Sequence, residues 1–153
     1  MNNVNSKRDR PELYCLNYRE CDPKKCTGYK LSRLNLLKII YRIDKNLKNC
    51  IILNPFASNE LSDLDRFLIS KFGLIVIDCS WGNIMNLKNL KFKNGRKLPP
   101  LIAANPTNYG KWEKLSSAEA LAAALYITNF PDKADLILSK FSWGNTFKKI
   151  NKF

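Results

Sequence analysis

Short runs of apolar residues, separated by polar and basic segments, make up the first part of the chain. The clearest run covers residues 74–77, follows Gly73 and ends abruptly in the polar tip 78–81 (Asp-Cys-Ser-Trp). Such a run is typical of a strand covered on both faces of a parallel sheet. In open α/β sheets, ligands bind just beyond the carboxyl ends of these strands. The tip is therefore the first candidate site, although the same residue types also form plain turns.

Residues 13–18 and 50–53 have the composition of two further strands. After the second, Ser62 and Asp65 have the spacing of a capping box. The helix that would follow places its apolar residues on one face before Gly73 ends it, namely Leu64, Phe67, Leu68 and Phe72. This order predicts a βαβ unit with parallel strands. Residues 31–40 stay open between helix and strand, because their apolar spacing is helical but Ile39 and Ile40 are β-branched.

The remaining segments are predicted to be loops, one further strand and a group of helices. Residues 21–30 are predicted to be a basic loop, Asn94 and Gly95 mark a turn, and the proline-bracketed segment 98–106 is predicted to be a last strand. Ser116 and Glu119 then form a second capping box, and the pattern predicts helices to the end. We expect an α/β fold with a mostly parallel sheet, divided into a polar leader (1–11), an α/β half (12–97) and a mainly helical half (98–153).

Charge is the strongest global signal. The chain carries 26 Lys and Arg against 13 Asp and Glu, a net charge of +13. This excess favours a nucleic-acid partner over a membrane, since no segment approaches the roughly twenty apolar residues of a spanning helix. The polar amino terminus does not resemble a signal peptide, so we expect a cytoplasmic protein. The basic residues predicted to hold RNA phosphates are Lys24, Lys25, Lys30, Arg33, Arg96 and Lys97.

The chain has five cysteines and no histidine. The odd number and irregular spacing argue against a disulfide scaffold, and Cys15, Cys21 and Cys26 lack the paired spacing of a zinc site. We therefore expect no metal. Without histidine, the commonest general base near neutral pH is missing. Phosphate-loop, dinucleotide and nucleophile-elbow motifs are missing too, so any catalysis depends on carboxylates, on positioning or on a reactive cofactor.

Five ordered motifs closely resemble one family, the small-subunit rRNA aminocarboxypropyltransferases of archaeal and eukaryotic ribosome biogenesis. The resemblance runs from about residue 13 to residue 151, and its motifs lie at residues 22–28 (DPKKCTG), 76–81 (VIDCSW), 98–110 (LPPLIAANPTNYG), 117–120 (SAEA) and 141–144 (FSWG). One departure is Asn54 before Pro55, where relatives commonly have serine. We expect little consequence, because the proline determines the turn.

The resemblance implies a SPOUT-like fold in which the C-terminal half completes a deep trefoil knot, and it implies a monomer. It also implies S-adenosylmethionine as the donor of a 3-amino-3-carboxypropyl group to N3 of a pseudouridine, or of a methylated or unmodified relative, in small-subunit rRNA. The donor-binding positions that it implies are Thr27, Ile77, Trp81, Leu101, Leu115, Ser116 and Ala120. Asp78 matches a carboxylate near the reacting centre, and Trp81 is assigned to donor orientation.

A different class of function stays open at this point. A non-catalytic RNA-binding assembly factor would need the same basic charge. Affinity for S-adenosylmethionine separates the two hypotheses. Asp78 is expected to hold the donor or to serve the strand end, rather than to act as a general base.

Overall fold

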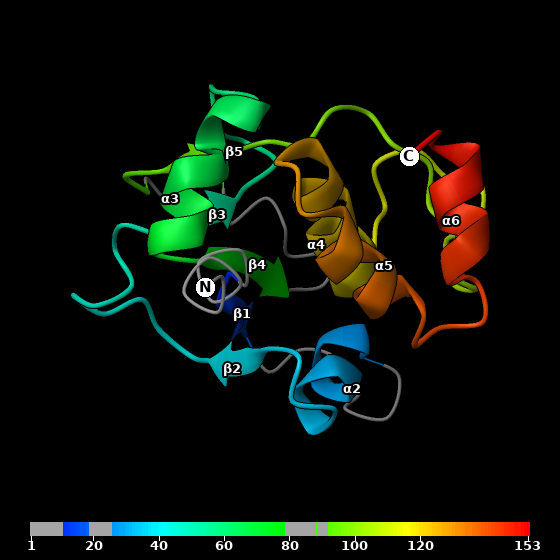
Figure 1. The fold of residues 1–153 in the computed structure, drawn as a ribbon, viewed down its shortest axis with the longest axis horizontal. Coiled ribbons are helices and arrows are strands. Elements are labelled where there is room, and N and C mark those ends of the chain that lie inside the picture. Colours follow the sequence, from blue (N-terminus) through cyan, green and yellow to red (C-terminus); the bar gives the residue numbers. More distant parts are fainter. Residues whose placement is uncertain (1–10, 19–25, 79–87, 89–91) are drawn as a thin grey trace, which may run out of the picture.

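A parallel sheet of five strands forms the centre of the molecule (Figure 1). We describe it from a computed structural model, in residues 11–18, 26–78, 88 and 92–153. The spatial order is β2-β1-β4-β3-β5, and every pairing is parallel. The strands are β1 (Leu13–Asn17), β2 (Lys38–Ile40), β3 (Ile51–Leu53), β4 (Leu74–Asp78) and β5 (Gly95–Arg96). The predicted parallel sheet and the βαβ unit of β3 and β4 are thus confirmed.

Side chains of the central strands alternate between two apolar layers, as the period of a strand requires. In β4, Leu74 and Val76 belong to the larger core under the helices, whereas Ile75 and Ile77 belong to a smaller cluster on the opposite face. The first three residues of β4 are fully or nearly fully buried. The prediction that the run at residues 74–77 is covered on both faces is confirmed.

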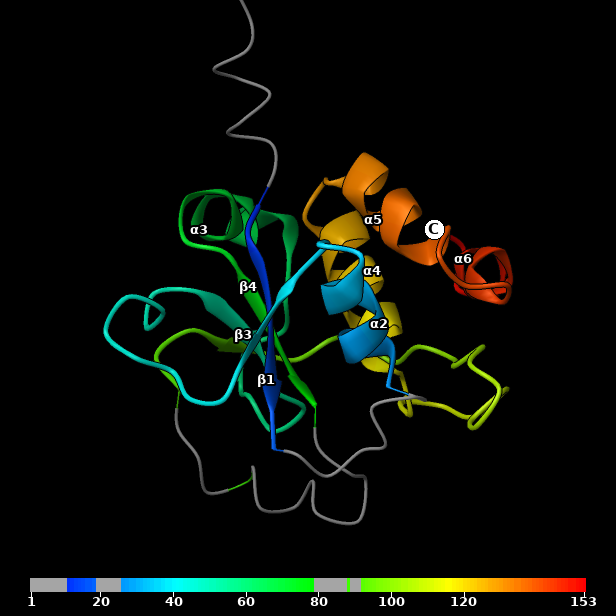
Figure 2. The same cartoon turned by 90° about the horizontal axis from the view of Figure 1, so that it is seen from below.

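Helix α4 (Ser117–Ile127) joins the two parts of the chain. It packs on β4, on α2 (Thr27–Arg33) and on α5 (Pro131–Leu138), as Figure 2 shows. Its alanines, from Ala122 to Ala124, are completely buried and allow this close packing. One apolar core therefore includes residues from both predicted halves, with α6 (Gly144–Ile150) on the outer side of α4 and α5. In the described residues, no helix has both the length and the apolar character required to cross a bilayer.

One prediction about local structure was wrong near the first loop. Helix α2 begins at Thr27, within the segment predicted to be a loop, and its N-cap residue is Cys26. The open segment 31–40 contains both alternatives, since α2 ends at Arg33 and β2 follows at Lys38. The Gly28 that suggested a loop instead allows close packing, because a Cβ there would lie 3.0 Å from the Cys15 Sγ.

The predicted strand at residues 98–106 was also wrong. The segment forms one isolated antiparallel bridge, between Ile102 and Trp112, and the fifth strand is β5, which the sequence indicated as part of a turn. Prolines cannot donate to a ladder, and the N–H groups of the segment go elsewhere. Ile102 donates to Asn151 Oδ1, and Ala104 donates to Glu119 Oε2.

The helix after Ser62 is present, but only part of its predicted apolar face is buried: Leu68 and Phe72 pack against the apolar clusters, and Leu64 and Phe67 do not. Its capping box forms as predicted, on a 3₁₀ turn η1 (Asp63–Asp65) that precedes α3 (Arg66–Lys71). Because a 3₁₀ turn has three residues per turn, it shifts the register of the residues that follow. Leu64 and Phe67 are consequently 87% and 67% exposed, whereas Ile69 is buried.

Candidate functional site

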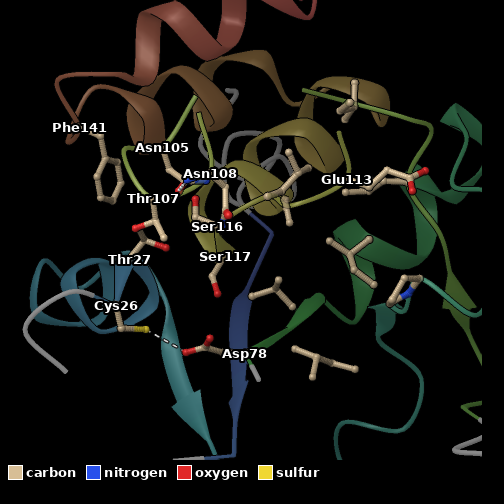
Figure 3. A pocket seen from close by; sticks show the side chains of 18 of the residues that line it. Cys26, Thr27, Asp78, Asn105, Thr107, Asn108, Glu113, Ser116, Ser117 and Phe141 are labelled. Carbon is tan, nitrogen blue, oxygen red and sulfur yellow. Dashed lines mark hydrogen bonds between the residues drawn. The ribbon is translucent and has the colours of Figure 1, made fainter. Parts of the chain in front are cut away.

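A cavity of about 980 Å³ opens at the carboxyl ends of the central strands. Strands β1 and β4 are neighbours, but β1 leads through α2 to β2 on one side, and β4 leads to β5 on the other. Ligands of open α/β sheets bind at such a switch point. The lining comes from the ends of β3 and β4, the starts of α2 and α4, the segment 97–108 and the α5–α6 connection (Figure 3).

Asp78 is the last residue of β4 and connects three elements at the floor of this cavity. It lies opposite Asn17 in the register of β1 and β4. Its Oδ2 accepts hydrogen bonds from Asn17 Nδ2 at 3.2 Å and from Cys26 Sγ at 2.9 Å. Figure 3 shows the second contact at the start of α2. One carboxylate oxygen thus fixes the end of β1 and the N-cap of α2 relative to β4.

The starts of α2 and α4 are joined by a side chain that lines the cavity. Thr27 Oγ1 accepts a hydrogen bond from the backbone N–H of Ala118 at 3.0 Å. That N–H is among the first of α4, which have no partner within the helix. Thr27 therefore acts as a cap supplied by a residue 91 positions earlier in the chain.

The nearby thiol of Cys15 is structural. Burial, with a smaller contribution from Asp78 and Cys26, raises the pKa of this thiol far above its ordinary value. A protonated, fully buried thiol is a poor nucleophile and a poor metal ligand. In the part of the chain that the structure describes, no three Cys, Asp or Glu side chains gather as metal ligands would.

Glu119 organises the upper wall of the cavity although it does not line it. Its side chain is completely buried. Oε2 accepts from the backbone N–H groups of Ala104 at 2.6 Å and Asn105 at 3.2 Å. Oε1 accepts from Asn105 Nδ2 at 2.6 Å and from the N–H of Ser116 at 2.9 Å. The capping box of α4 thereby also holds the segment 104–105 and the cavity residue Asn105 in place.

The α5–α6 connection closes another side of the cavity through Lys30. Its Nζ donates to the backbone carbonyl of Lys140 at 2.7 Å and lies 4.7 Å from the centre of the Phe141 ring. Phe141 in turn stacks on Trp143, with ring centres 4.7 Å apart. Lys30, Phe141 and Trp143 all line the cavity, so this wall combines aromatic surface with a positive charge.

The structure brings most of the predicted donor-site residues together. The cavity is lined by Asp78 and by six of the donor-binding positions, which are Thr27, Ile77, Leu101, Leu115, Ser116 and Ala120. They come from β4, α2, α4 and the segments before α4, so the convergence depends on the fold and not on proximity in sequence. Trp81 lies outside the described residues.

The predicted RNA-binding residues are more scattered. Lys30 and Lys97 line the cavity, whereas Arg33 is exposed near the end of α2. Arg96 Nε pairs with Asp65 Oδ1 at 3.1 Å, and its side chain is only 17% exposed. Lys24 and Lys25 lie outside the described residues. Basic composition alone does not show whether a lysine or arginine is bound to a carbonyl or carboxylate of the protein or is free to contact RNA.

Several residues that line the cavity or support it were missed at the level of sequence. Asn17 and Cys26 act through Asp78, and Asn105 acts through Glu119. The motif at residues 117–120 contains Glu119, but only its role in the capping box could be read from spacing. Contacts with residues 104 and 105 require the segment before α4 to fold back over the helix.

The fold and the cavity define a class: an α/β protein with a parallel sheet and a ligand-sized cavity at the topological switch point. Comparison with known proteins names the family. The family model "Ribosome biogenesis protein, C-terminal" matches residues 51–153. A second model, "Possible Fer4-like domain in RNase L inhibitor, RLI", matches residues 11–45, which contain β1, α2 and β2 of the same sheet.

Similarity to individual proteins extends over nearly the whole chain. The 16S rRNA aminocarboxypropyltransferase of Methanocaldococcus jannaschii is 47% identical, over 92% of this chain and 83% of its own length. That of Thermoplasma volcanium is 50% identical, over 92% of this chain and 84% of its own length. The solved structure of the SAM-dependent rRNA:acp-transferase Tsr3 from Vulcanisaeta distributa is 38% identical and superposes with a TM-score of 0.87, covering 93% of this chain and 79% of that one.

The chain belongs to the 16S rRNA aminocarboxypropyltransferase family, a family of transferases. The resemblance seen in the five motifs is thereby confirmed.

Proposed function

We propose that this chain transfers the 3-amino-3-carboxypropyl group of S-adenosylmethionine to N3 of a pseudouridine, or of a methylated or unmodified relative, in small-subunit rRNA. The observation that carries the proposal is the convergence of seven matched positions on one cavity. They are Thr27, Ile77, Asp78, Leu101, Leu115, Ser116 and Ala120. The names of the relatives support the class of reaction and the RNA, and the name of the structural neighbour supports the donor.

The cavity suits such a donor in size and chemistry. Its volume lies in the range of small-molecule sites, which combine an apolar lining with a few placed polar groups. Ile77, Leu101 and Leu115 supply apolar wall, and Thr27 and Asp78 supply oxygen atoms. Ala120 and Ser116 are small, which leaves room at the start of α4.

The donor supplies a sulfonium bonded to three carbons. Any of these carbons can be transferred to a nucleophile that lies in line with the bond between that carbon and sulfur. The protein decides the product by orientation. We propose that Trp81 covers the methyl side, so that the aminocarboxypropyl arm points toward the RNA. Asp78, whose Oδ2 is already fixed by Asn17 and Cys26, is proposed to hold the donor. Transfer forms a bond between N3 and the first carbon of the arm and breaks the bond between that carbon and sulfur. The sulfur keeps the electron pair and leaves as the neutral thioether of the donor, and the N3 proton is released to solvent.

Mass spectrometry of small-subunit rRNA after incubation with the protein and S-adenosylmethionine tests this function. We expect a mass increase equal to one aminocarboxypropyl group on a uridine-type nucleoside. A methyl increment would contradict the proposed orientation. An unmodified rRNA, together with no donor affinity in a titration, would instead favour the non-catalytic RNA-binding assembly factor.

Trp81→Ala tests the orientation separately. We expect weaker donor binding and slower transfer, because the proposed wall beside the methyl group is removed. Trp112→Ala, which changes an indole that does not line the cavity, is the matched control and should leave donor affinity unchanged. Unchanged donor affinity and transfer in Trp81→Ala would remove that residue from the site.

We also propose that the C-terminal half completes a SPOUT-type trefoil knot, and that the protein works as a cytoplasmic monomer. The parallel sheet and the similarity to the Tsr3 structure support the fold relationship. An experimental structure that traces residues 79–91 would test the knot, and sedimentation equilibrium would test the monomer.

A further inference from the structure

The segment that precedes α4 folds back on itself at the edge of the cavity. The N–H of Ala103 donates to the carbonyl of Lys111 at 2.9 Å, and the N–H of Gly110 donates to the carbonyl of Ala103 at 2.8 Å. The N–H of Glu113 donates to the carbonyl of Leu101 at 2.8 Å. We call residues 106–114 the rim loop. Figure 2 shows it in yellow-green, extending from the body of the molecule beside α4.

The base of the rim loop is held from below by a buried network. Asn105 Oδ1 accepts from the N–H of Asn108 at 3.1 Å, and Asn105 Nδ2 donates to the buried carboxylate of Glu119 at 2.6 Å. Gly110 and Glu113 have φ angles of +78° and +61°, in the left-handed region that tight turns use. The loop is therefore a defined turn anchored to the core, although its outer residues are exposed.

Two large aromatic side chains of the rim loop lie in solvent. Tyr109 is 64% exposed and Trp112 is 61% exposed. Lys111 and Lys114 beside them are exposed as well. Thr107, Asn108 and Glu113 of the same loop line the cavity (Figure 3). An anchored turn thus presents exposed rings and cations at the edge of the cavity.

We propose that the rim loop is a stacking platform for an unpaired rRNA base that flanks the modified nucleotide. This inference rests on the proposed function for the identity of the polymer. Proteins recognise single-stranded RNA by stacking its bases on exposed aromatic rings, with basic side chains on the backbone. Because the backbone of the loop is already ordered, less conformational freedom is lost when its rings bind. The net charge of +13 and the two lysines fit RNA, whereas an apolar protein partner would find these rings interspersed with three charged residues.

Binding measurements can separate stacking from charge. The probe is a single-stranded RNA oligonucleotide of mixed sequence, compared with an abasic strand of the same length and the same number of phosphates. We expect Tyr109→Ala and Trp112→Ala each to weaken binding of the normal strand by roughly ten-fold and to leave the abasic strand unaffected. Tyr109→Phe and Trp112→Phe should restore most of the affinity, because a ring is retained.

The lysines should give the opposite signature. Lys111→Gln and Lys114→Gln should each reduce the slope of log affinity against log salt by about 0.7 for one phosphate contact, whereas the aromatic variants should leave that slope unchanged. Phe67→Ala is the matched control, since Phe67 is 67% exposed on α3 and does not line the cavity. We expect its RNA affinity to equal that of the parent.

Donor affinity completes the test. Titration with S-adenosylmethionine should give the same affinity for Trp112→Ala as for the parent, because Trp112 does not line the cavity. RNA affinity equal to the parent in both alanine variants would overturn the inference, and so would an equal loss on the abasic strand. If the parent binds RNA but transfers nothing, the proposed function is wrong. The RNA affinities of the variants still test the stacking platform in that case.

Discussion

Cys26 donates a hydrogen bond from Sγ to Oδ2 of Asp78, across 2.9 Å, between the N-cap of α2 and the end of β4. Asn17 Nδ2 donates to the same oxygen at 3.2 Å. These bonds tie two adjacent strands and a helix together at the point where the chain changes direction in the sheet. The shared acceptor makes it possible to separate the charge of Asp78 from its structural role.

Asp78→Asn should weaken donor binding with little change in stability. The amide oxygen of asparagine can accept from Cys26 and Asn17 as Oδ2 does, whereas the negative charge is lost. If that charge holds the cationic donor, the dissociation constant should rise about ten-fold, which corresponds to 1.4 kcal/mol. Isothermal titration with S-adenosylmethionine and urea unfolding would measure the two effects.

Cys26→Ala provides the comparison, because it removes one hydrogen bond and keeps the carboxylate. A purely structural Asp78 would instead give normal donor affinity in Asp78→Asn, with reduced stability confined to Cys26→Ala. If Asp78→Asn kept full donor affinity and normal stability but lost transfer, Asp78 would instead be acting on the N3 proton.

The sequence was sufficient for the parts of the fold that depend on local patterns. The buried run at residues 74–77 predicted a central parallel strand, and the spacings Ser62–Asp65 and Ser116–Glu119 predicted capping boxes that the structure contains. It was insufficient at residues 98–106, where the N–H groups of Ile102 and Ala104 donate to the side chains of Asn151 and Glu119 instead of to a strand. Those acceptors lie later in the chain, and periodicity carries no information about them.

For the candidate site, too, the sequence identified some residues and could not identify others. Motif resemblance identified Thr27 and Asp78, and the fold places both at one cavity. It could not identify Asn17 or the second role of Glu119, because these follow from the register of β1 with β4 and from the return of residues 104–105 over α4. Charge was the least specific guide, since Arg96 is committed to Asp65.

Glu119→Gln should destabilise the protein strongly. Each carboxylate oxygen of Glu119 accepts two N–H groups, so the amide nitrogen of glutamine would face donors in either orientation of the side chain. Leaving buried donors unpaired costs about 1–3 kcal/mol for each group. We expect a loss of about 3 kcal/mol or more in the free energy of unfolding, measured by urea denaturation.

The same substitution should expose the base of the rim loop. Hydrogen exchange of the backbone amides of Ala104 and Asn105 should speed up in Glu119→Gln more than exchange in β1. Asp65→Asn is a matched control, since Asp65 serves the capping box of η1 away from the cavity. If exchange at residues 104 and 105 stayed at the parent rate, Glu119 would not be what holds that segment.

Thr27→Val should loosen the joint between α2 and α4. The substitution keeps the shape of the side chain but removes the oxygen that accepts from the N–H of Ala118, which is a buried residue. We expect a loss of about 1–3 kcal/mol in the free energy of unfolding, and weaker donor binding. Thr27→Ser retains the acceptor and should recover most of both; losses in Thr27→Ser as large as those in Thr27→Val would contradict the role of the hydroxyl as the cap.

Stability should fall as the pH rises above about 9, and Cys15 should account for part of the loss. Burial raises the pKa of the Cys15 thiol above its ordinary value of 9.0, so the unfolded chain releases this proton at a lower pH than the folded protein. The folded state therefore binds more protons above pH 9, and the free energy of unfolding decreases there, by at most about 1.4 kcal/mol per pH unit for one group. Below pH 9 the thiol is protonated in both states and contributes no slope.

Urea denaturation at pH 8 and pH 10 under reducing conditions would measure the loss in the parent and in Cys15→Ala. The variant should be less stable at pH 8, because a cavity is created, but it should lose less between the two pH values. An identical loss in both proteins would show that the Cys15 thiol ionises as readily in the folded state as in the unfolded chain.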